Sequence, residues 1–220
     1  ENGVTLDAYP GDGPSPFARG DAGPVITLLG RVDPVKGLDL AVAALAVLRR
    51  RHPRAALVLA GPDRDGHGAV LRHQAAALGV TDGLHFTGLV VGERKAALLA
   101  QSDQLWLCSR MESFGNVVLE ALAAGTPVVA VRSTPWAWLE QAGLGAHCEA
   151  SAEAVARAAE ALLTRYQSAE ARATFATHAQ AEVAQRFAWP AIAARMTRLY
   201  EAVASASPAP WSSRAPASVR

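Results

Sequence analysis

Five short apolar runs recur along the chain, and each is followed by a segment whose apolar residues return at helical spacing. Strands alternating with helices are typical of a parallel sheet, because a crossover between parallel strands needs a helix-sized connection. We therefore expect an α/β, Rossmann-like fold with one parallel sheet and helices on both faces. Glycine ends or closely follows several runs, as at a turn from strand to helix. The expected strands span residues 25–29, 56–60, 84–87, 104–108 and 127–131.

Helical segments are expected after each of these runs. Beyond Ser151 the chain is rich in Ala, Arg and Glu, and breaks at Ser168 and at Trp189-Pro190 divide it into three C-terminal helices. We expect these three helices to cover the sheet and complete the domain. The earlier helices are expected over residues 38–51, 68–78, 93–101, 116–124 and 136–142.

The two ends of the chain differ in composition from its middle. Residues 1–24 are rich in Gly, Pro and Asp without a sustained period, which predicts a linker or arm. Residues 205–220 are mostly Ser, Ala and Pro, so a disordered tail is expected there. The folded domain is therefore expected to span residues 25–204. Since the chain starts at Glu1 without a methionine, we expect it to be a piece of a longer protein.

Composition argues against several classes of function. Lys and Arg (21) nearly balance Asp and Glu (20), which gives no support for binding nucleic acid or an anionic membrane. No apolar run approaches the ~20 residues needed to span a bilayer. Cys108 and Cys148 lie among apolar or small residues without metal-ligand spacing. Both are interpreted as structural thiols of a reducing, cytoplasmic compartment.

The stretch from Glu112 to Glu120 reads E-S-F-G-N-V-V-L-E and lies at an expected strand-to-helix turn. The first amides of a helix lack intrahelical partners and, with the helix dipole, favour an anion, for which phosphate is the obvious candidate. Gly115 allows a ligand to approach the backbone closely, and Asn116 is suited to begin the helix. Glu120, about one turn into the helix, can accept hydrogen bonds from sugar hydroxyls.

Two carboxylates beside a phosphate require positive charge from elsewhere in the chain. The loop after the first expected strand, Gly30-Arg31-Val-Asp-Pro-Val-Lys36-Gly37, supplies it at the carboxyl edge of the sheet. Ligands bind at that edge in open parallel sheets. Arg31 can fork onto a phosphate, and Lys36 can act as a point charge. The alternative is that both are ordinary solvated surface residues.

These segments together resemble the C-terminal, donor-binding domain of the group 1 (family 4) glycosyltransferases, which is one half of a GT-B fold. The resemblance covers about residues 25–163. Its specific part is the run with two glutamates and the trailing A-G-T-P-V, residues 112–130, and residues 61 and 86–88 add to it. Residues 2–4, Asn-Gly-Val, also resemble the N-G-V just past the interdomain hinge of such enzymes.

The resemblance implies retaining transfer of a sugar from a nucleoside-diphosphate sugar, with no bound metal and no other cofactor. It implies that Arg31 and Lys36 hold the diphosphate, that Glu120 binds ribose and that Glu112 contacts the sugar. The implied catalytic set is Glu112, Arg31 and Lys36. The expected donor-binding set comprises Gly30, Gly61, Gly88, Leu89, Ser113, Phe114, Gly115, Asn116, Val117 and Glu120.

The resemblance also implies partners. The acceptor is expected on an N-terminal domain that the chain lacks, and peripheral association of the full-length enzyme with a membrane stays open.

After the fifth expected strand, Ser133-Thr-Pro-Trp136 replaces the Gly-rich turn of many relatives. This variant looks like enzymes that build bacterial surface polysaccharide or lipopolysaccharide. The alternative role for Trp136 and Trp138 is to pack the short helix that follows.

Several interpretations stay open beside this one. Gly61 and residues 88–90 are candidates for backbone contacts to the nucleoside, with plain strand-end turns as the alternative. Ser109 and Arg110 also stand where they can face the site, although Arg110 is equally suited to a solvated position. A rival function is a non-catalytic module that binds a sugar nucleotide or another phospho-ligand.

Two other enzyme classes are disfavoured. A glycosidase needs two carboxylates that flank one glycosidic bond, which is not the arrangement expected for the two glutamates. A dinucleotide-dependent oxidoreductase needs a G-x-G-x-x-G turn after the first strand, and Gly30-Arg31 does not begin one.

Overall fold

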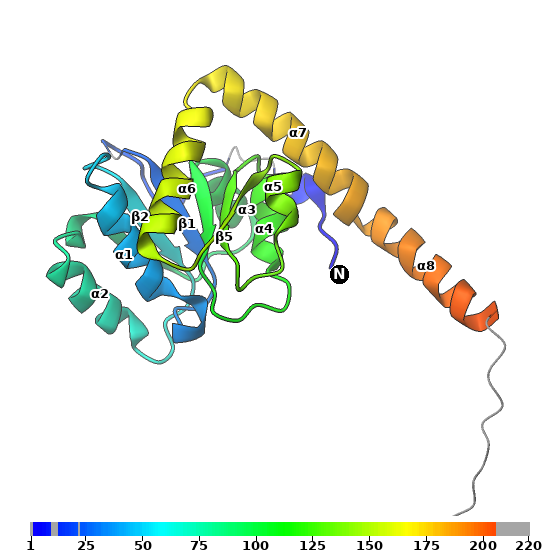
Figure 1. The fold of residues 1–220 in the computed structure, drawn as a ribbon, viewed down its shortest axis with the longest axis horizontal. Coiled ribbons are helices and arrows are strands. Elements are labelled where there is room, and N and C mark those ends of the chain that lie inside the picture. Colours follow the sequence, from blue (N-terminus) through cyan, green and yellow to red (C-terminus); the bar gives the residue numbers. More distant parts are fainter. Residues whose placement is uncertain (1, 10–12, 22, 206–220) are drawn as a thin grey trace, which may run out of the picture.

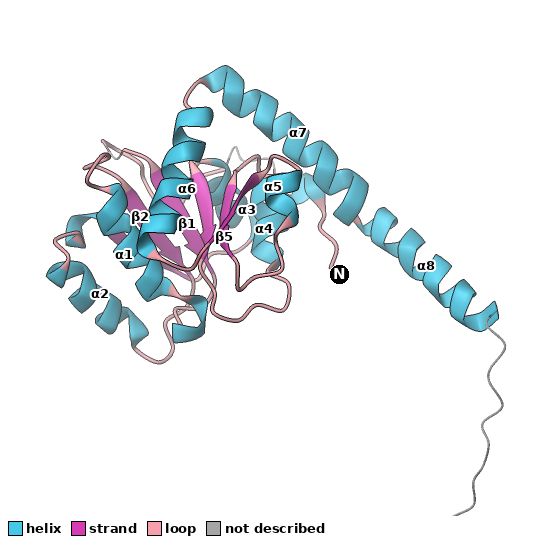
Figure 2. Ribbon diagram, in the orientation of Figure 1, coloured by secondary structure: helices cyan, strands magenta, loops and turns pink. Residues whose placement is uncertain are grey.

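The structure, a computed structural model, describes residues 2–9, 13–21 and 23–205. Its centre is one sheet of six parallel strands in the order β3-β2-β1-β4-β5-β6 (Figure 2). The prediction of an α/β fold built on a parallel sheet is confirmed. The strands are β1 (Val25–Leu29), β2 (Ala56–Ala60), β3 (Leu84–Gly88), β4 (Gln104–Leu107), β5 (Val128–Val131) and β6 (Gly145–Cys148).

Helices cover both faces of the sheet, as expected (Figure 1). They are α1 (Leu38–Leu48), α2 (His67–Ala77), α3 (Gly92–Ala100), α4 (Asn116–Ala123), α5 (Trp138–Gln141), α6 (Ala152–Arg165), α7 (Ala169–Phe187) and α8 (Trp189–Ser205), with 3-10 turns η1 (Leu6–Ala8), η2 (Pro34–Lys36) and η3 (Thr81–Gly83). Strand side chains alternate between the faces. In β2, Leu57 and Leu59 pack under α1, α2 and α6, whereas Val58 packs against α3 on the opposite face, which α4, α5 and α7 also cover.

The sixth strand, β6, corrects the expectation of five. It pairs in parallel with β5, so that Ala146 lies opposite Val129. Its residues, Gly-Ala-His-Cys, form no apolar run, and all four are only partly buried at the edge of the sheet. An edge strand packs fewer neighbours than a central one, so it can form from residues of weak strand propensity. Periodicity in the sequence therefore gives no signal for it.

The expected breaks between the C-terminal helices are confirmed. Ser168 precedes α7 and accepts a hydrogen bond from Ala171 N–H, and α8 begins at Trp189. α6 packs on α1, β5 and β6, while α7 packs on α4. These two helices complete the layers of the domain.

Helix α8 departs from the expectation that all three helices cover the sheet. It runs outward from the body of the domain (Figure 1), and Ile192 is its one buried residue. Ser205, expected to open a disordered tail, is the last residue of α8, and residues 206–220 lie outside the described residues. Across the ranges that the structure describes, no helix has both the length and the apolar character needed to cross a membrane.

The first part of the expected arm is docked on the domain. Val4, only 7% exposed, donates its N–H to the Phe187 carbonyl at 2.9 Å and forms an isolated parallel bridge with Ala188. Gly3 lies so close to the indole of Trp189 that a Cβ there would stand 2.6 Å from the ring. The arm therefore packs on the junction between α7 and α8.

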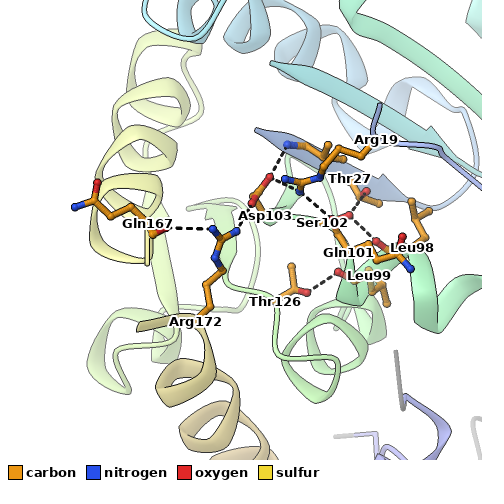
Figure 3. A network of polar contacts seen from close by, with 11 residues as sticks. Arg19, Thr27, Leu98, Leu99, Gln101, Ser102, Asp103, Thr126, Gln167 and Arg172 are labelled. Carbon is orange, nitrogen blue, oxygen red and sulfur yellow. Dashed lines mark hydrogen bonds and ion pairs between the residues drawn. The ribbon is translucent and has the colours of Figure 1, made fainter. Parts of the chain in front are cut away.

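Asp103 ties the arm, β1 and α7 together in the turn that leads into β4 (Figure 3). Its Oδ2 accepts hydrogen bonds from Arg19 Nη2 at 2.6 Å and from Val25 N–H at 2.7 Å, and its Oδ1 accepts from Arg172 Nη1 at 2.9 Å. The Asp103 side chain is 11% exposed, whereas the two arginines are about half exposed. The carboxylate thus holds three segments that are distant in the sequence.

We predict that Asp103→Asn lowers the free energy of unfolding by about 1.5–3 kcal/mol, the range for hydrogen bonds to a charged group. The amide keeps the size of the side chain but loses its charge and presents N–H groups to two donors. Urea unfolding measures the loss. Asp65→Asn, at an exposed position, is the matched control and should shift stability by about 0.5 kcal/mol at most. Equal stabilities for the two variants would contradict the role of the network.

Candidate functional site

The strand order reverses between β1 and β4, so the helices that follow these two strands lie on opposite faces of the sheet. A crevice opens outside the carboxyl ends of strands at such a switch point. Here it holds a cavity of about 270 Å³. The lining residues include Gly30, Arg31, Lys36, Ser109, Glu112, Gly115, Asn116 and Val117.

Lys36 and Glu112 meet at this cavity from the loops after β1 and β4. Lys36 Nζ donates to Glu112 Oε2 at 2.7 Å, and Ser109 Oγ donates to the same oxygen at 3.2 Å. The two charged side chains are 26% and 13% exposed. A partly buried pair of this kind is less screened than a surface pair. Lys36 therefore neutralises Glu112 where an anion would otherwise be repelled.

Arg31 lies at the mouth of the cavity with its side chain 58% exposed. Its Nη1 is 3.2 Å from Asp33 Oδ2, while Asp33 Oδ1 accepts from Val35 N–H and caps η2. Exposed ion pairs contribute little energy. The guanidinium can therefore turn toward an anion in the cavity at small cost.

Helix α4 begins at the cavity wall without a side-chain cap. Its N-cap is Gly115, with φ of 83°, and the first helical residue is Asn116. The expectation that the helix begins at Asn116 is confirmed, and the Asn116 side chain does not cap it, because its Oδ1 accepts from Asn2 Nδ2 of the arm at 2.8 Å. An uncapped N-terminus leaves backbone N–H groups and the positive end of the helix dipole toward a ligand.

Trp136 holds the turn that leads into α4. It is 2% exposed, its Nε1 donates to the Phe114 carbonyl, and its ring packs 5.1 Å from that of Phe114. Since α5 begins at Trp138, Trp136 lies outside the short helix. Packing the short helix is therefore not the whole role of Trp136, because its contacts with Phe114 also hold the loop between Glu112 and α4 in place.

Glu120 lies away from the main cavity. It lines a neighbouring cavity of about 220 Å³ together with Tyr9 and Asn116, and Asn116 lines both cavities. Glu120 Oε1 accepts from Lys95 Nζ of α3 at 2.9 Å. The two expected sugar-binding carboxylates are therefore each held by a lysine from another element.

Besides Glu120, five expected donor-binding residues do not line the main cavity. Gly61 is buried, and a Cβ there would stand 1.8 Å from the Gly30 carbonyl oxygen, which gives it a packing role. Gly88 and Leu89 are exposed at the end of β3, the edge strand. The functional roles of these residues stay predictions. The five are Gly61, Gly88, Leu89, Ser113 and Phe114.

Arg110 points to the loop after β1. Its guanidinium donates to Asp39 Oδ2 and to the Pro34 carbonyl, and its N–H donates to Val35 O at 2.8 Å. Burial disfavours the Asp39 carboxylate, but the hydrogen bond and charge of Arg110 outweigh it and lower the pKa of Asp39. Arg110 thus fixes the η2 turn that carries Lys36.

The two cysteines are free thiols, as the structural interpretation requires. Burial raises the pKa of Cys108, which lines the floor of the cavity, and also that of the half-buried Cys148. Both therefore stay protonated at neutral pH. Within the part of the chain that the structure describes, no three His, Cys, Asp or Glu side chains are grouped to hold a metal ion.

Sequence reasoning missed Lys95, Tyr9 and Asn2 as neighbours of the site. Lys95 and Glu120 are separated by 25 positions, and Asn2 and Asn116 by 114. Neither pair follows a helical or strand period. Nothing in a single sequence signals contacts between a lysine on one helix and a carboxylate on the next.

Residues 16–181 match the profile of the family described as glycosyl transferases group 1. The chain belongs to this family. The family predicted from the residues around Glu112 is thus confirmed, and the sheet with its helices is one half of a GT-B fold.

Curated relatives of the chain are longer than it is, and the chain aligns with only part of each. D-inositol 3-phosphate glycosyltransferase of Salinispora arenicola is 42% identical over 120 residues, which are 50% of this chain and 26% of that protein. Phosphatidyl-myo-inositol mannosyltransferase of Mycobacterium leprae is 30% identical over 207 residues, 93% of this chain and 53% of that protein. The chain therefore spans about half, or less, of these curated relatives.

Among solved structures, Anabaena HepE in complex with UDP-glucose is 25% identical with a TM-score of 0.72. The alignment covers 91% of this chain and 56% of HepE. This group 1 chain thus shares its fold with about half of a larger protein.

We predict that Gly37→Ala costs about 4 kcal/mol of stability or prevents folding, because a new Cβ would stand 2.0 Å from the Cys108 carbonyl oxygen. Gly66→Ala is the matched control. Both glycines are left-handed N-caps, with φ of 62° and 72°, but a Cβ at Gly66 meets nothing within 4 Å. Gly66→Ala should cost only the roughly 1–2 kcal/mol of the left-handed backbone. Thermal unfolding of both variants tests the close contact, and equal losses would contradict it.

Proposed function

We propose that this chain is the donor-binding half of a retaining glycosyltransferase and holds a nucleoside-diphosphate sugar in the crevice between β1 and β4. One observation carries the proposal. Lys36, Glu112 and the uncapped start of α4 converge on a single cavity at the switch point of the sheet. These groups offer a cation, a sugar-binding carboxylate and anion-binding amides around one cavity.

The charges fit a diphosphate leaving group. Lys36 already neutralises Glu112, so the exposed Arg31 and the α4 amides remain to hold phosphate oxygens. Donors that are in place before the reaction stabilise the negative charge that grows on the diphosphate in the transition state. Glu112 is then left to contact the transferred sugar, and no metal ion is needed to offset the phosphate charge.

A solved structure and a curated relative support a nucleotide sugar as donor and a lipid-linked acceptor. HepE was solved with UDP-glucose and shares the fold over most of this chain, which favours a nucleotide sugar as ligand. The acceptor is proposed to be a glycan or a lipid-linked molecule of bacterial polysaccharide or lipopolysaccharide synthesis. The relative from M. leprae, named as acting on phosphatidyl-myo-inositol, supports a lipid-linked acceptor. The rest of the full-length protein would hold this acceptor, in the cytoplasm.

Calorimetry on this chain with UDP, GDP and ADP should detect binding of at least one of the three. Arg31→Ala removes a donor to the phosphate, and Lys36→Ala leaves the Glu112 charge unpaired beside it, so each should weaken that binding by about 1–3 kcal/mol. Arg157→Ala removes an exposed cation on α6 and serves as the control with unchanged affinity. Failure of all three diphosphates to bind would overturn the proposal.

The rival function is a non-catalytic module that binds a sugar nucleotide or another phospho-ligand. We expect Glu112→Gln in the full-length protein to abolish transfer or hydrolysis of the sugar nucleotide while binding is kept, because the amide lacks the charge that contacts the sugar. Turnover is followed by release of the nucleoside diphosphate. Binding without turnover in the unaltered full-length protein would favour the module instead. The isolated chain should transfer little sugar, since transfer needs donor and acceptor held together.

A further inference from the structure

The loop after β5 meets the loop that carries Glu112 at two points. Ser133 Oγ donates to the Ser109 carbonyl at 2.7 Å, ahead of Glu112, and Trp136 Nε1 donates to the Phe114 carbonyl behind it. Since β4 and β5 are paired neighbours in the sheet, the Ser133 hydroxyl continues, past the strand ends, the contact that backbone groups make between the strands. Both ends of the Glu112 loop are thus attached to residues that follow β5.

The peptide group between Ser109 and Arg110 is held from two sides. Its carbonyl accepts from Ser133 Oγ at 2.7 Å, and its N–H donates at 2.8 Å to the Val35 carbonyl in the loop after β1. The strands β1 and β5 flank β4, so loops from both neighbouring strands fix one peptide plane. Ser109 is only 1% exposed, and a single side-chain torsion sets where its hydroxyl oxygen lies.

The two oxygens of Glu112 differ in their partners. Oε2 accepts from Lys36 Nζ at 2.7 Å and from Ser109 Oγ at 3.2 Å. Oε1 has no hydrogen-bond partner in the described part of the chain. Within that part, the unpaired polar side-chain atoms that are also closed to solvent belong to Asp39, His52, His67 and Glu120. Oε1 of Glu112 is therefore open, and it belongs to a residue that lines the main cavity.

The loop after β5 is itself anchored at the edge of the sheet. The hydroxyl of Thr134, which is 4% exposed, donates to the Val131 carbonyl at 2.7 Å, and His147 Nε2 of β6 lies 3.1 Å from the Thr134 carbonyl oxygen. Arg132 donates its N–H at 2.9 Å to a carbonyl at the end of β6. Ser133 lies between these two anchored residues, so its hydroxyl is carried by a fixed backbone although the residue is exposed.

We propose that Ser133 is a positioning residue, which acts through Ser109 to hold Glu112 with Oε1 toward the transferred sugar. This inference rests on the proposed donor function and names the residue that orients its sugar-binding carboxylate. Lys36 supplies the charge, but an ammonium on a flexible stem with rotatable donors gives little direction. The Ser109 hydroxyl supplies the direction, and Ser133 keeps that hydroxyl in place.

Recognition of the sugar would then depend on a residue that touches no ligand. Without the Ser133 hydroxyl, the Ser109 carbonyl loses a donor and the peptide is held from one side only. The Glu112 carboxylate can then turn about Lys36, which balances its charge in several orientations. The diphosphate, held by Arg31 and by the amides at the start of α4 under the proposed function, does not depend on this rotation.

Calorimetry on this chain tests the role of Ser133 with matched ligand pairs: UDP with UDP-glucose, GDP with GDP-mannose and ADP with ADP-glucose. For the pair that binds, Ser133→Ala should raise the dissociation constant of the sugar nucleotide about threefold or more, as expected for a weakened hydrogen bond. That of the nucleoside diphosphate should change by less than about twofold. Ser133→Thr keeps the hydroxyl and should restore the wild-type values. Glu112→Gln, measured alongside, gives the change expected when the sugar contact itself is lost.

Ser168→Ala is the matched control for a loss of stability alone. Ser168 is exposed, and its Oγ accepts from Ala171 N–H at the start of α7. Loss of this cap should lower the melting temperature and leave both dissociation constants unchanged. A variant that weakens sugar recognition only through a less stable fold would therefore be matched by Ser168→Ala, and such a match would contradict the positioning role.

The outcomes separate the two proposals. Failure of every nucleoside diphosphate to bind would refute the donor function, and the role of Ser133 with it. If a diphosphate binds but Ser133→Ala weakens both ligands of its pair equally, or neither, only the role of Ser133 is overturned. The same holds if no sugar nucleotide binds, or if Glu112→Gln leaves its binding unchanged. Should Ser133→Ala not fold, Ser109→Ala removes the hydroxyl that binds Glu112, and the same two dissociation constants decide.

Discussion

The close passage of the turn after β1 against the end of β4 is the constraint on which the rest of the site depends. At Gly37 the backbone lies so near the Cys108 carbonyl that any side chain would collide with it, and at Gly61 the Gly30 carbonyl imposes the same condition. The first of these contacts joins the loops after β1 and β4, whose helices α1 and α4 lie on opposite faces of the sheet. Lys36 lies immediately before Gly37, so the same contact that joins the loops also delivers the cation to Glu112.

The neighbours of this turn stabilise it from outside the cavity. Arg110 follows the end of β4 and binds the carbonyls of η2 as well as the Asp39 carboxylate at the start of α1. On the other side, Trp136 donates to the Phe114 carbonyl and packs against its ring. The residues that would touch a ligand are thus placed by residues that would not. Such support is what holds a charged site in a geometry ready for its ligand.

The sequence predicts most of the strands and the charged loops at the site, and there are physical reasons why it does not predict the rest. Apolar periodicity predicts the central strands because they are buried on both faces, but β6 lies at an edge and carries no such pattern. Cations in the loop after β1 and carboxylates after β4 are predictable because parallel strands end at a common edge. Pairings such as Lys95 with Glu120 depend on the rotation of two packed helices, which no local period records. The extension of α8 away from the sheet is equally absent from local patterns, since its helical spacing is that of a packed helix.

The negative charge of each of the two glutamates around the start of α4 is balanced in the same way, by a lysine. Each gives one oxygen to a lysine from another strand–helix unit, Lys36 for Glu112 and Lys95 for Glu120, at 2.7 and 2.9 Å. Since each pair is neutral, the field at the helix start is governed by the α4 dipole and by the exposed Arg31. Under the proposed function, this balance would let the site attract a doubly charged diphosphate although its most prominent motif is acidic. For the proposed ligand, carboxylates that would repel it if left alone would serve instead as hydrogen-bond acceptors once each is paired with a lysine.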